Sequence, residues 1–368
     1  MRRLWEPAPS GEAGVPDGQC RPGRPERMQR RMGRSARRVV AILAVLYAGA
    51  LLALTAQQIA APQRDGWLAL GEVFAPWLFL PLLLAVPLAL VRGMNTLRIA
   101  LLVCAVVFAV RFVPWPRAAS AAEPSGATRV RVMTWNVREG GRRADVDALL
   151  GTQPADIVSV DEADWRWMDT DPVLRAAYPY EHAVRGDPVA SVVLFSRYPI
   201  TTAGMLDTPP GVWDPIRAIW AHVTLPAGQD LLVVAAHPPP AERCRGPCPS
   251  LDVYDARARD ARLSSIRAFI APELAAGRPV IIAGDLNTTP REPAYAGVTQ
   301  GLHDAFAEVG QGVGATWRTA LLNDTLPPLL RIDYLLSSPN VPPLRAAVDC
   351  TPRGSDHCLV TADFAVPP

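Results

Sequence analysis

The chain has 368 residues, of which 49% are hydrophobic and 20% are charged, and its formal net charge is +2. This length allows one large domain or two ordinary ones. The first 38 residues carry ten arginines against four acidic residues, whereas the part from residue 124 onward carries 22 arginines against 28 acidic residues. An acidic C-terminal part without an evident basic stripe disfavours non-specific binding to long nucleic acid.

Residues 1–36 are rich in proline, glycine and arginine and have almost no apolar side chains to bury. This composition predicts a disordered, Arg-rich tail. The segment is too long and too polar to be the start of a secretory signal peptide.

Three apolar runs lie within residues 37–116, and each is a candidate transmembrane helix. They extend over residues 39–56, 67–91 and 97–115. The second contains Glu72 and the third contains Arg111, whose charge would have to reach the membrane interface. A bilayer core of about 30 Å is crossed by about 20 helical residues, so we expect three transmembrane helices in the lipid bilayer. A buried helical hairpin of a soluble protein is the alternative, but the first two runs lack a polar face.

The arginines that flank these runs predict their orientation. Arg34, Arg37 and Arg38 directly precede the first run, and Arg92 lies between the second and the third. Because positively charged loops remain on the cytoplasmic side, the N-terminal tail should be cytoplasmic and the C-terminal part extracytoplasmic. We therefore expect a multi-pass protein of the cell membrane. Residues 117–128, rich in alanine, serine, proline and glycine, should form a flexible linker.

From residue 129 to residue 368 the pattern becomes α/β. Apolar, strand-like runs occur at residues 130–137, 156–160, 190–195, 217–223, 231–236, 279–283, 332–336 and 359–364. Residues 253–275 have a helical pattern, with Leu263, Ile266 and Ile270 on one face and Arg257, Arg259 and Arg267 largely elsewhere.

Polar residues that can bind a metal or a phosphate stand where these strands begin or end. They are Asn136, Asp161, Glu162, His237, Asp285, Asn287, Asp333, Asp356 and His357. Ligand sites of open α/β sheets gather at the carboxyl ends of strands. Carboxylates, amides and imidazoles are the groups that a hard cation and a phosphoryl group require. A single Asn or Asp at such a position is more simply a capping residue, so the prediction depends on the whole set.

Seven short motifs carry a resemblance to a known family. They are Thr-Trp-Asn-Val at 134–137, Asp-Ile-Val-Ser-Val-Asp-Glu at 156–162, Leu-Phe-Ser-Arg-Tyr-Pro-Ile at 194–200, the Ala-Ala-His-Pro-Pro segment around His237, Gly-Asp-Leu-Asn at 284–287, Arg-Ile-Asp-Tyr at 331–334 and Ser-Asp-His at 355–357. In this order they resemble the endonuclease/exonuclease/phosphatase family over about residues 128–366. The resemblance implies that residues 129–368 are a catalytic domain, a two-sheet α/β sandwich flanked by helices.

The resemblance also implies a metal site. Glu162 matches the family's principal metal carboxylate, Asn136 a neighbouring oxygen ligand, and Asp356 a further metal or water contact. Oxygen ligands without a thiolate or histidine cluster suit Mg²⁺, or Mn²⁺, better than Zn²⁺. Asp161 departs from the amide that commonly precedes the family's glutamate, which leaves the local charge open.

Five further residues match catalytic positions of the family. His357 resembles the histidine that acts on the attacking water or the phosphate, and Asp333 the carboxylate that orients its ring. Asp285 resembles the residue that positions or activates water, and Asn287 an amide donor to the phosphate. His237 resembles a second histidine, which donates to the transition state or to the leaving oxygen.

These residues predict a membrane-anchored, metal-dependent phosphoesterase that hydrolyses a phosphodiester by attack of water on phosphorus. An acidic, external, membrane-tethered domain suits a lipid headgroup or a small phosphodiester better than duplex DNA. Arg217 begins a strand and could bind the substrate phosphate, although an ordinary surface arginine explains it as well. His237 stands where apurinic-site endonucleases resemble one another in having a tyrosine, which disfavours that subclass.

Two other functions remain open. An extracytoplasmic nuclease acting on DNA or RNA is the alternative enzyme, and a catalytically idle binding or sensory domain on a membrane anchor is the alternative of another class. No protein partner is evident from the sequence.

Four cysteines belong to the C-terminal part, and two disulfides are the predicted arrangement. Cys244 and Cys248 enclose three residues, and Cys350 and Cys358 flank the Ser-Asp-His motif. We expect the pairs Cys244–Cys248 and Cys350–Cys358, although four cysteines allow three pairings and sequence cannot decide among them. Disulfides fit an extracytoplasmic domain, whereas four free thiols would fit a cytoplasmic one.

Overall fold

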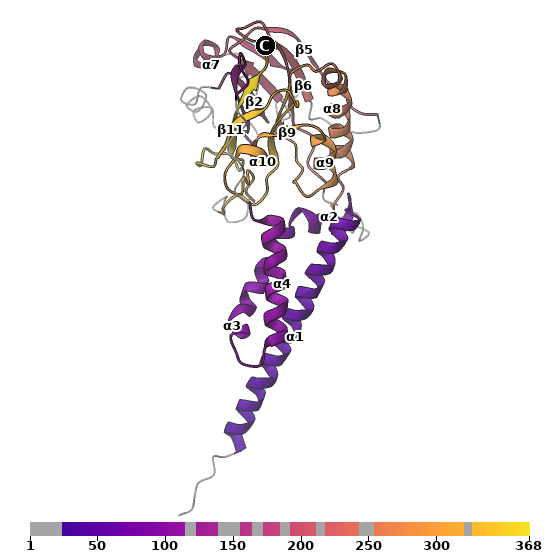
Figure 1. The fold of residues 1–368 in the computed structure, drawn as a ribbon, viewed down its shortest axis with the longest axis vertical. Helices are drawn as coiled ribbons and strands as arrows, with labels where there is room; N and C mark the ends of the chain where they lie inside the picture. Colours follow the sequence, from indigo (N-terminus) through magenta and orange to yellow (C-terminus); the bar gives the residue numbers. More distant parts are fainter. Residues whose placement is uncertain are drawn as a thin grey trace, which may run out of the picture. The chain divides into compact units, whose positions relative to one another are not determined.

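The protein forms two compact units. The computed structural model describes residues 24–114, 123–138, 155–163, 172–184, 192–210, 218–242, 254–319 and 326–368 (Figure 1). One unit lies within residues 1–50 and 81–103, and the other within residues 51–80 and 104–368. The second unit contains the whole α/β domain together with the helical segment that adjoins it in the sequence.

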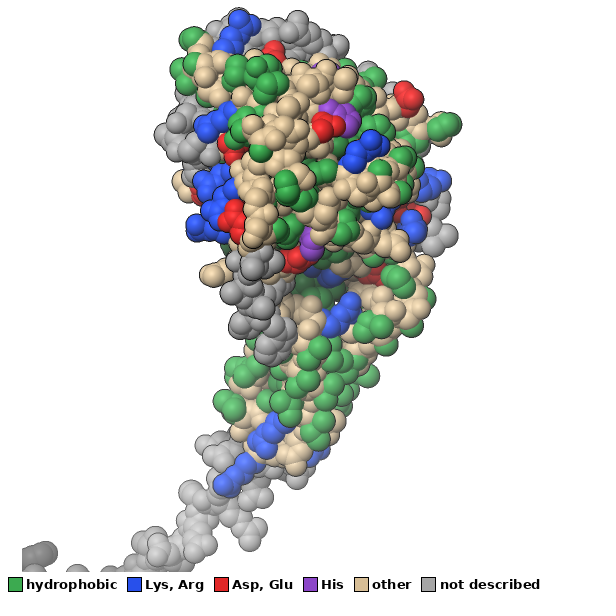
Figure 2. All heavy atoms as spheres, turned by 45° about the horizontal axis from the view of Figure 1, so that its top comes forward, with side chains coloured by type: hydrophobic (Ala, Val, Ile, Leu, Met, Phe, Trp, Pro, Cys, Tyr) green, Lys and Arg blue, Asp and Glu red, His purple; other side chains and the backbone are tan. Residues whose placement is uncertain are grey.

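Two helices of the N-terminal part are long and apolar enough to cross a membrane, namely Ser35–Ala60, within helix α1 (Arg24–Ala60), and helix α4 (Asn95–Phe112). Hydrophobic side chains cover much of their surface (Figure 2). The expectation that all of residues 1–36 are disordered is wrong from Arg24 onward, because α1 already begins there. Arginine, methionine and glutamine favour helices, and Pro25 lies at the first turn, where proline is tolerated.

The second apolar run is not one continuous helix as predicted. It divides into α2 (Gly66–Val73), a 3-10 helix η1 (Ala75–Ala85) and α3 (Val86–Ala89), with a bend of 73° after α2. Pro76, Pro81 and Pro87 explain the break, because proline lacks an N–H group and disfavours the α conformation in the residue before it. The described residues therefore contain two candidate spans, or three if this bent pair is one span.

The C-terminal domain is built on two six-stranded sheets. The first has the order β11-β12-β1-β2-β4-β3, with β1 (Thr128–Asn136), β2 (Ile157–Asp161), β3 (Tyr180–Ala183), β4 (Val192–Ser196), β11 (Pro343–Asp349) and β12 (Leu359–Val366). The second has the order β5-β6-β7-β8-β10-β9, with β5 (Ile200–Met205), β6 (Ala218–Thr224), β7 (Asp230–Ala236), β8 (Val280–Asp285), β9 (His303–Asp304) and β10 (Asp333–Ser337). This confirms the predicted two-sheet sandwich, and each of the predicted strand runs contains a strand.

Apolar side chains from both sheets form the central core. Val132 and Leu194 of the first sheet belong to the same fully buried cluster as Val233 and Ala283 of the second. The alternation of side chains along a strand directs one half of them inward, so that two sheets can pack face to face.

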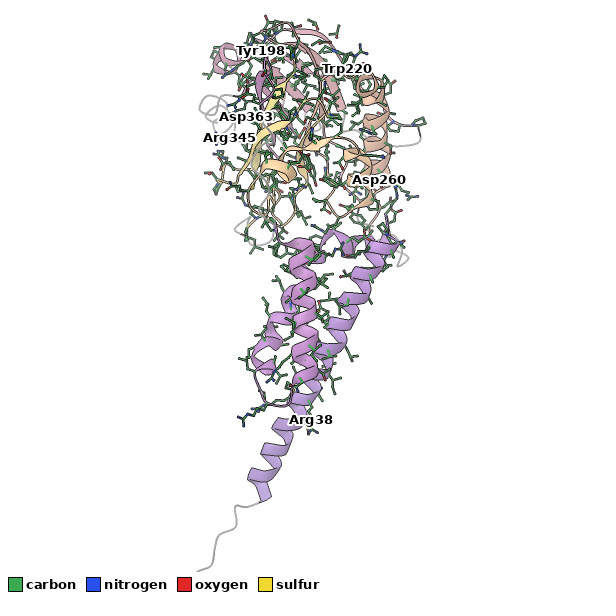
Figure 3. All side chains as sticks on the ribbon, in the orientation of Figure 1. Arg38, Tyr198, Trp220, Asp260, Arg345 and Asp363 are labelled. Atoms are coloured by element: carbon green, nitrogen blue, oxygen red, sulfur yellow. A yellow bond between two sulfur atoms is a disulfide. The ribbon has the colours of Figure 1, made fainter. Side chains whose placement is uncertain are left out.

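Helices cover the domain's periphery. They are α7 (Pro172–Ala177), α8 (Arg257–Ala275), α9 (Pro293–Thr299) and α10 (Ala305–Val309). Leu263, Ile266 and Ile270 of α8 are buried in a cluster with β7 and β8, as the helical periodicity predicted. Trp220 of β6, labelled in Figure 3, packs on Phe269 of α8 with ring centroids 5.6 Å apart.

Strand direction brings the polar strand ends to one edge of the sandwich. β1 runs parallel to β2, and β7 runs parallel to β8, so that within each pair the carboxyl ends meet. β10 is antiparallel to β8, and its first residue, Asp333, pairs with the last residue of β8, Asp285. Gly284 must be glycine, because a Cβ there would lie 1.9 Å from the carbonyl oxygen of Ala236.

Candidate active site

The strand ends surround a cavity of about 440 Å³. The predicted site residues that line it are Glu162, His237, Asp285, Asn287, Asp356 and His357. Asn136 and Asp333 are buried and reach these residues through hydrogen bonds. Arg217 lies outside the described residues. The structure therefore gathers eight of the nine predicted residues, separated by up to 221 positions in sequence, around one cavity.

The carboxylate of Asp285 is the meeting point of these side chains. Its Oδ2 accepts a hydrogen bond from Nδ2 of Asn136 at 3.1 Å. The Nε2 atoms of His237 and His357 both lie 3.7 Å from the same oxygen. Asn136 also donates to Oε1 of Glu162 at 3.0 Å. Burial, followed by the charge of Asp333, raises the pKa of Asp285, so that this carboxyl group is poised to take up a proton.

His357 is held by Asp333. Its Nδ1 lies 3.0 Å from Oδ2 and 3.2 Å from Oδ1 of Asp333, whose side chain is fully buried. This contact fixes the ring so that Nδ1 is the donor and Nε2 faces Asp285. Burial alone would lower the pKa of His357, but the charges of Asp333 and Asp285 outweigh it and raise the pKa to about 10.

His237 has the opposite electrostatic character. It is almost completely buried, and within the described part of the chain its Nδ1 has no hydrogen-bond partner. Burial lowers its pKa, which favours the neutral ring at neutral pH. Its Nε2 lies 3.8 Å from Glu162 Oε1 and 3.7 Å from Asp285 Oδ2. The cavity thus holds one histidine, His357, whose protonated form is favoured and another, His237, whose neutral form is favoured. General acid–base catalysis requires such a pair of groups.

Asp161 lies beneath the site. Its Oδ2 accepts a hydrogen bond from the N–H of Asp285 at 2.9 Å, and its Oδ1 is buried without a partner among the described residues. Burial, together with the neighbouring carboxylates, raises the pKa of Asp161 well above its ordinary value. In its protonated form, which this shift favours, the carboxyl group offers both a donor and an acceptor, as an amide does.

Three residues of the cavity wall have a left-handed backbone conformation. They are Arg138, Glu162 and Asn287, with φ of 56°, 58° and 51°. Such a conformation costs about 1–3 kcal/mol for a residue with a side chain, although asparagine tolerates it better. All the described non-glycine residues with positive φ thus lie in this cavity, where they aim the polar side chains.

The residues fit a divalent cation by their chemistry. Glu162 and Asp285 place carboxylate oxygens around one amide donor, and the neighbouring His237 favours its neutral form and so contributes no positive charge. The tightest group of ligand-type atoms in the described residues is Asp285, Asp333 and His357, within 4.8 Å of one another. Because Asp333 is already engaged by His357, a hard cation is better served by the more exposed carboxylates of Glu162 and Asp356.

One predicted metal ligand, Asn136, does not turn its amide oxygen toward the carboxylates. Asn136 turns Nδ2 toward the carboxylates, while its Oδ1 accepts from the N–H of Arg138 at 2.9 Å. The amide would have to turn over to offer its oxygen to a cation. Asp356 lines the cavity, and its Oδ2 accepts from Nε1 of Trp317 at 3.2 Å.

The sequence did not reveal two arginines, of which Arg138 lines the cavity and Arg259 lies behind its lining residues Asn287 and Glu292. Arg138 lines the cavity, and its Nε lies 3.8 Å from Oδ1 of Asp356. The only indication in the sequence is that Arg138 follows Asn136 by two residues. Arg259 was expected off the buried face of α8, but it is buried and donates to the carbonyl of Asn287 at 2.9 Å. It also donates to Glu292 Oε1 at 2.7 Å. No local pattern announces such a contact, because its partners are 28 and 33 residues away.

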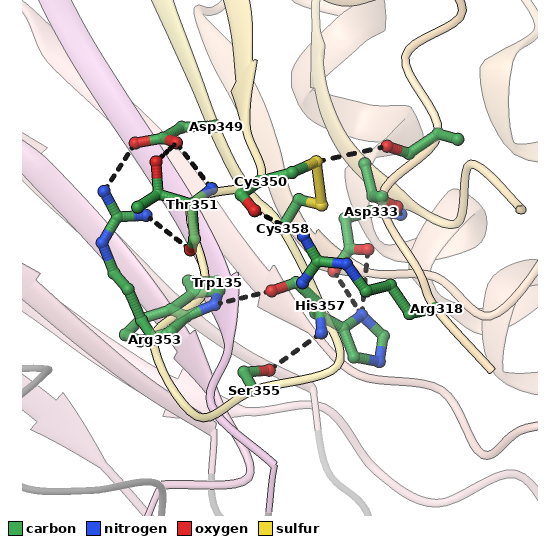
Figure 4. Close-up of a disulfide and its surroundings, with 12 residues drawn as sticks. Trp135, Arg318, Asp333, Asp349, Cys350, Thr351, Arg353, Ser355, His357 and Cys358 are labelled. Atoms are coloured by element: carbon green, nitrogen blue, oxygen red, sulfur yellow. Dashed lines mark hydrogen bonds and ion pairs between the residues drawn. A yellow bond between two sulfur atoms is a disulfide. The ribbon is translucent and has the colours of Figure 1, made fainter. Parts of the chain in front are cut away.

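A disulfide braces the loop that carries Asp356 and His357. Cys350, after β11, is bonded to Cys358, before β12, as predicted (Figure 4). The indole of Trp135 donates to the carbonyl of His357 at 3.2 Å, and the hydroxyl of Ser355 accepts from its N–H at 2.9 Å. The predicted pair Cys244–Cys248 lies outside the described residues.

The chain belongs to the Endonuclease/Exonuclease/phosphatase family, which matches residues 133–357. It is a hydrolase that acts on phosphate ester bonds. No curated protein sequence matches the chain.

Solved structures show the same fold. A family protein from Bacteroides thetaiotaomicron is 16% identical, with a TM-score of 0.52, over 66% of this chain and 99% of its own. One from Bacteroides vulgatus is 21% identical, with a TM-score of 0.51, over 65% of this chain and 99% of its own. The 3'-5' exonuclease NExo from Neisseria meningitidis is 22% identical, with a TM-score of 0.50, over 64% and 99%.

Removal of the disulfide should loosen the catalytic loop. The bond joins residues eight positions apart, for which chain entropy accounts for about 2–3 kcal/mol of stability. We expect the full-length Cys350→Ser/Cys358→Ser variant to have a Tm lower by about 4–12 °C in scanning calorimetry. Cys104→Ala, at the buried cysteine of α4, is the control: added reductant should lower its Tm as much as it lowers that of the wild type. An unchanged Tm in the double variant would contradict a bracing role.

Asp333 and His357 should act as one unit. We expect His357→Ala to lower kcat for a chromogenic phosphodiester by about 10²–10⁴-fold. Asp333→Ala combined with it should lower kcat little further, because Asp333 acts through the ring. Asp363→Asn, a change at a β12 carboxylate that pairs with Arg131, is the control and should retain wild-type kcat. Additive losses in the double variant would show independent roles.

Proposed function

We propose that the protein is a membrane-anchored, divalent-metal-dependent phosphodiesterase. The carrying observation is the convergence of Asn136, His237 and His357 on the buried Asp285 carboxylate, next to Glu162. This set provides charge, proton donors and a proton acceptor within one cavity. In the proposed reaction the oxygen of water bonds to phosphorus, the ester P–O bond breaks, and the leaving oxygen takes up a proton.

We assign the metal site to Glu162, with Asn136 and Asp356 as further oxygen ligands. The oxygen donors favour Mg²⁺, or Mn²⁺, over softer metals. A cation held there supplies positive charge that stabilises the oxygens of the phosphoryl group.

The remaining residues handle protons and orient the phosphate. Asp333 holds the His357 ring, whose Nε2 faces Asp285. The protonated ring of His357 helps to orient water, and the carboxylate of Asp285 receives the proton that water gives up. The neutral His237 can donate from Nε2 to a phosphoryl or leaving oxygen. Asn287 donates one amide hydrogen to the carbonyl of Pro238 at 2.9 Å and has a second for the phosphate. Arg217 remains a predicted phosphate contact.

Contacts within the helical part support an odd number of membrane crossings. Ala41 of α1 packs with Leu97, near the start of α4, and the guanidinium of Arg111, near the end of α4, lies 3.5 Å from the carbonyl of Thr55 of α1. α1 and α4 therefore run in the same direction, which requires a return crossing between them. η1 and α3 together have 15 residues, or about 28 Å at the rises of 3-10 and α-helices, close to the thickness of the hydrocarbon core.

This topology supports a substrate at the membrane. With a cytoplasmic N-terminus, the catalytic domain is extracytoplasmic, in agreement with the disulfide Cys350–Cys358. The favoured substrate is a lipid headgroup or another small phosphodiester. DNA is the alternative, because a related Neisseria 3' phosphatase, NExo, was solved with a product DNA hairpin.

Activity should depend on the metal and on Glu162. We expect a chelator to abolish hydrolysis of bis-p-nitrophenyl phosphate by the full-length protein, and Mg²⁺ to restore it. Glu162→Gln should raise the Mg²⁺ concentration for half-maximal activity by at least about tenfold, because a neutral amide binds the cation less strongly. Glu308→Gln, at an exposed glutamate that pairs with His303, should not. Full activity in excess chelator would refute the assignment.

The orientation can be tested on intact cells with a membrane-impermeant maleimide. In a background in which Cys20, Cys104, Cys244 and Cys248 are replaced by serine or alanine, we expect labelling only after external reduction, because Cys350 and Cys358 form a disulfide on the outer side. The same cells after lysis without reductant should remain unlabelled. Thiols that are labelled after lysis alone would place the domain in the cytoplasm.

A further inference from the structure

Helix α2 forms an apolar wall of the candidate active site. Leu70, Val73 and Phe74, at its C-terminal end, line the same cavity as Glu162 and Asp285. The domain continues the apolar lining with Trp317, Leu330 and Ile332. The cavity therefore has a charged part, which suits a phosphate, and an apolar part, which would have to contact some other part of a substrate.

Specific contacts fasten α2 to the domain. The guanidinium of Arg291, in the loop between β8 and α9, donates to the carbonyls of Glu72 and Val73 at 2.9 and 2.6 Å. These are the last carbonyls of α2, where the helical hydrogen bonding ends and the negative end of the helix dipole lies. At the other end, the N–H of Gly66 donates to the carbonyl of Tyr254 at 2.8 Å. The wall is thus held by the loop that follows the catalytic strand end.

The exposed large side chains of α2 are also apolar. Trp67 is 61% exposed and Leu68 is 46% exposed, whereas Ala69 and Val73 are buried in a cluster with the domain residues Tyr254, Ala256, Leu330 and Ile332. An exposed tryptophan and leucine on a short helix between two candidate spans suit the membrane interface, where amphipathic rings accumulate. α2 accordingly has one apolar side available to lipid and another facing the cavity.

We propose that α2 is the specificity-determining wall of the active site and receives the apolar part of a lipid phosphoester whose phosphate lies at the charged end. This inference rests on the proposed phosphodiesterase activity and names its substrate class. A nucleic acid would instead place sugars and further phosphates at this wall. Among the described lining residues, Glu162, Asp285, Glu292 and Asp356 are acidic and Arg138 is the arginine, a poor counter-charge for several phosphates.

An alkyl series of chromogenic phosphodiesters tests the wall separately from the headgroup. Methyl, butyl and octyl p-nitrophenyl phosphate share one phosphodiester and one leaving group. Full burial of a methylene group corresponds to a factor of about four in affinity. With the full-length protein in lipid nanodiscs and Mg²⁺, we expect kcat/KM to rise at least about tenfold from the methyl to the octyl ester, since the chain is buried in part.

Two leucines of α2 give a matched pair of variants. Leu70→Asn changes the cavity side and should lower the octyl-to-methyl ratio of kcat/KM to near one, whereas Leu68→Asn makes the same change on the other side and should preserve the ratio. Phe74→Ala should lower it as well. Because the ratio is taken within one preparation, partial loss of folded protein or partition of the ester into lipid does not alter the comparison.

The outcomes separate this inference from the proposed function. A wild-type protein that hydrolyses none of the esters with Mg²⁺ would refute the phosphodiesterase assignment itself. Hydrolysis without preference for the octyl ester, or equal ratios in Leu70→Asn and Leu68→Asn, would leave the activity standing and overturn the role of α2. Slower cleavage of a single-stranded oligonucleotide by Leu70→Asn, with an unchanged alkyl ratio, would assign the wall to nucleic acid.

Discussion

The buried carboxylate of Asp285 is the contact on which the site depends. Its backbone N–H is bound by Asp161 at the end of β2, and its Oδ2 is bound by Asn136 at the end of β1, so that it joins the two sheets where their strands end. Burial of so much potential negative charge is costly unless protons or cations neutralise it. The raised pKa values of Asp161, Asp285 and His357 all express this constraint. A site arranged in this way is prepared both to hold a cation and to move a proton.

Helix α2 is held by the loop that follows Asp285. The segment from Asp285 to Glu292 contributes the buried carboxylate of Asp285, the left-handed Asn287 and Arg291, which binds the end of α2. Arg259 holds the same segment from α8 through the carbonyl of Asn287 and the carboxylate of Glu292. Displacement of α2 would therefore act directly on this loop. Helix α2 and the α/β domain are in this respect one structural unit.

Elements were predictable where a local pattern is strong and misjudged where it is weak. The inner strands are continuous apolar runs, because both of their faces are covered, and all of them were predicted. β3, with the sequence Tyr-Glu-His-Ala, and β5, with Ile-Thr-Thr-Ala-Gly-Met, lie at sheet edges, are partly exposed and were missed. The apolar run from residue 67 to residue 91 was read as one helix because its hydropathy is uniform. Its prolines, which interrupt helical hydrogen bonding, divide it into α2, η1 and α3.

The sequence by itself determined the family, the class of fold and the residue types of the site. Each motif is a short stretch that can be recognised locally, and the order of the motifs can be read directly from the chain. The tertiary structure alone decided which atoms meet: that both histidines approach one oxygen of Asp285, that their pKa values shift in opposite directions, and that Arg138 and α2 belong to the same cavity. The physical reason is that burial and Coulomb interactions depend on distances between residues that are far apart in sequence. Leu70 and Ile332, for example, are separated by 262 positions, and no local pattern relates them.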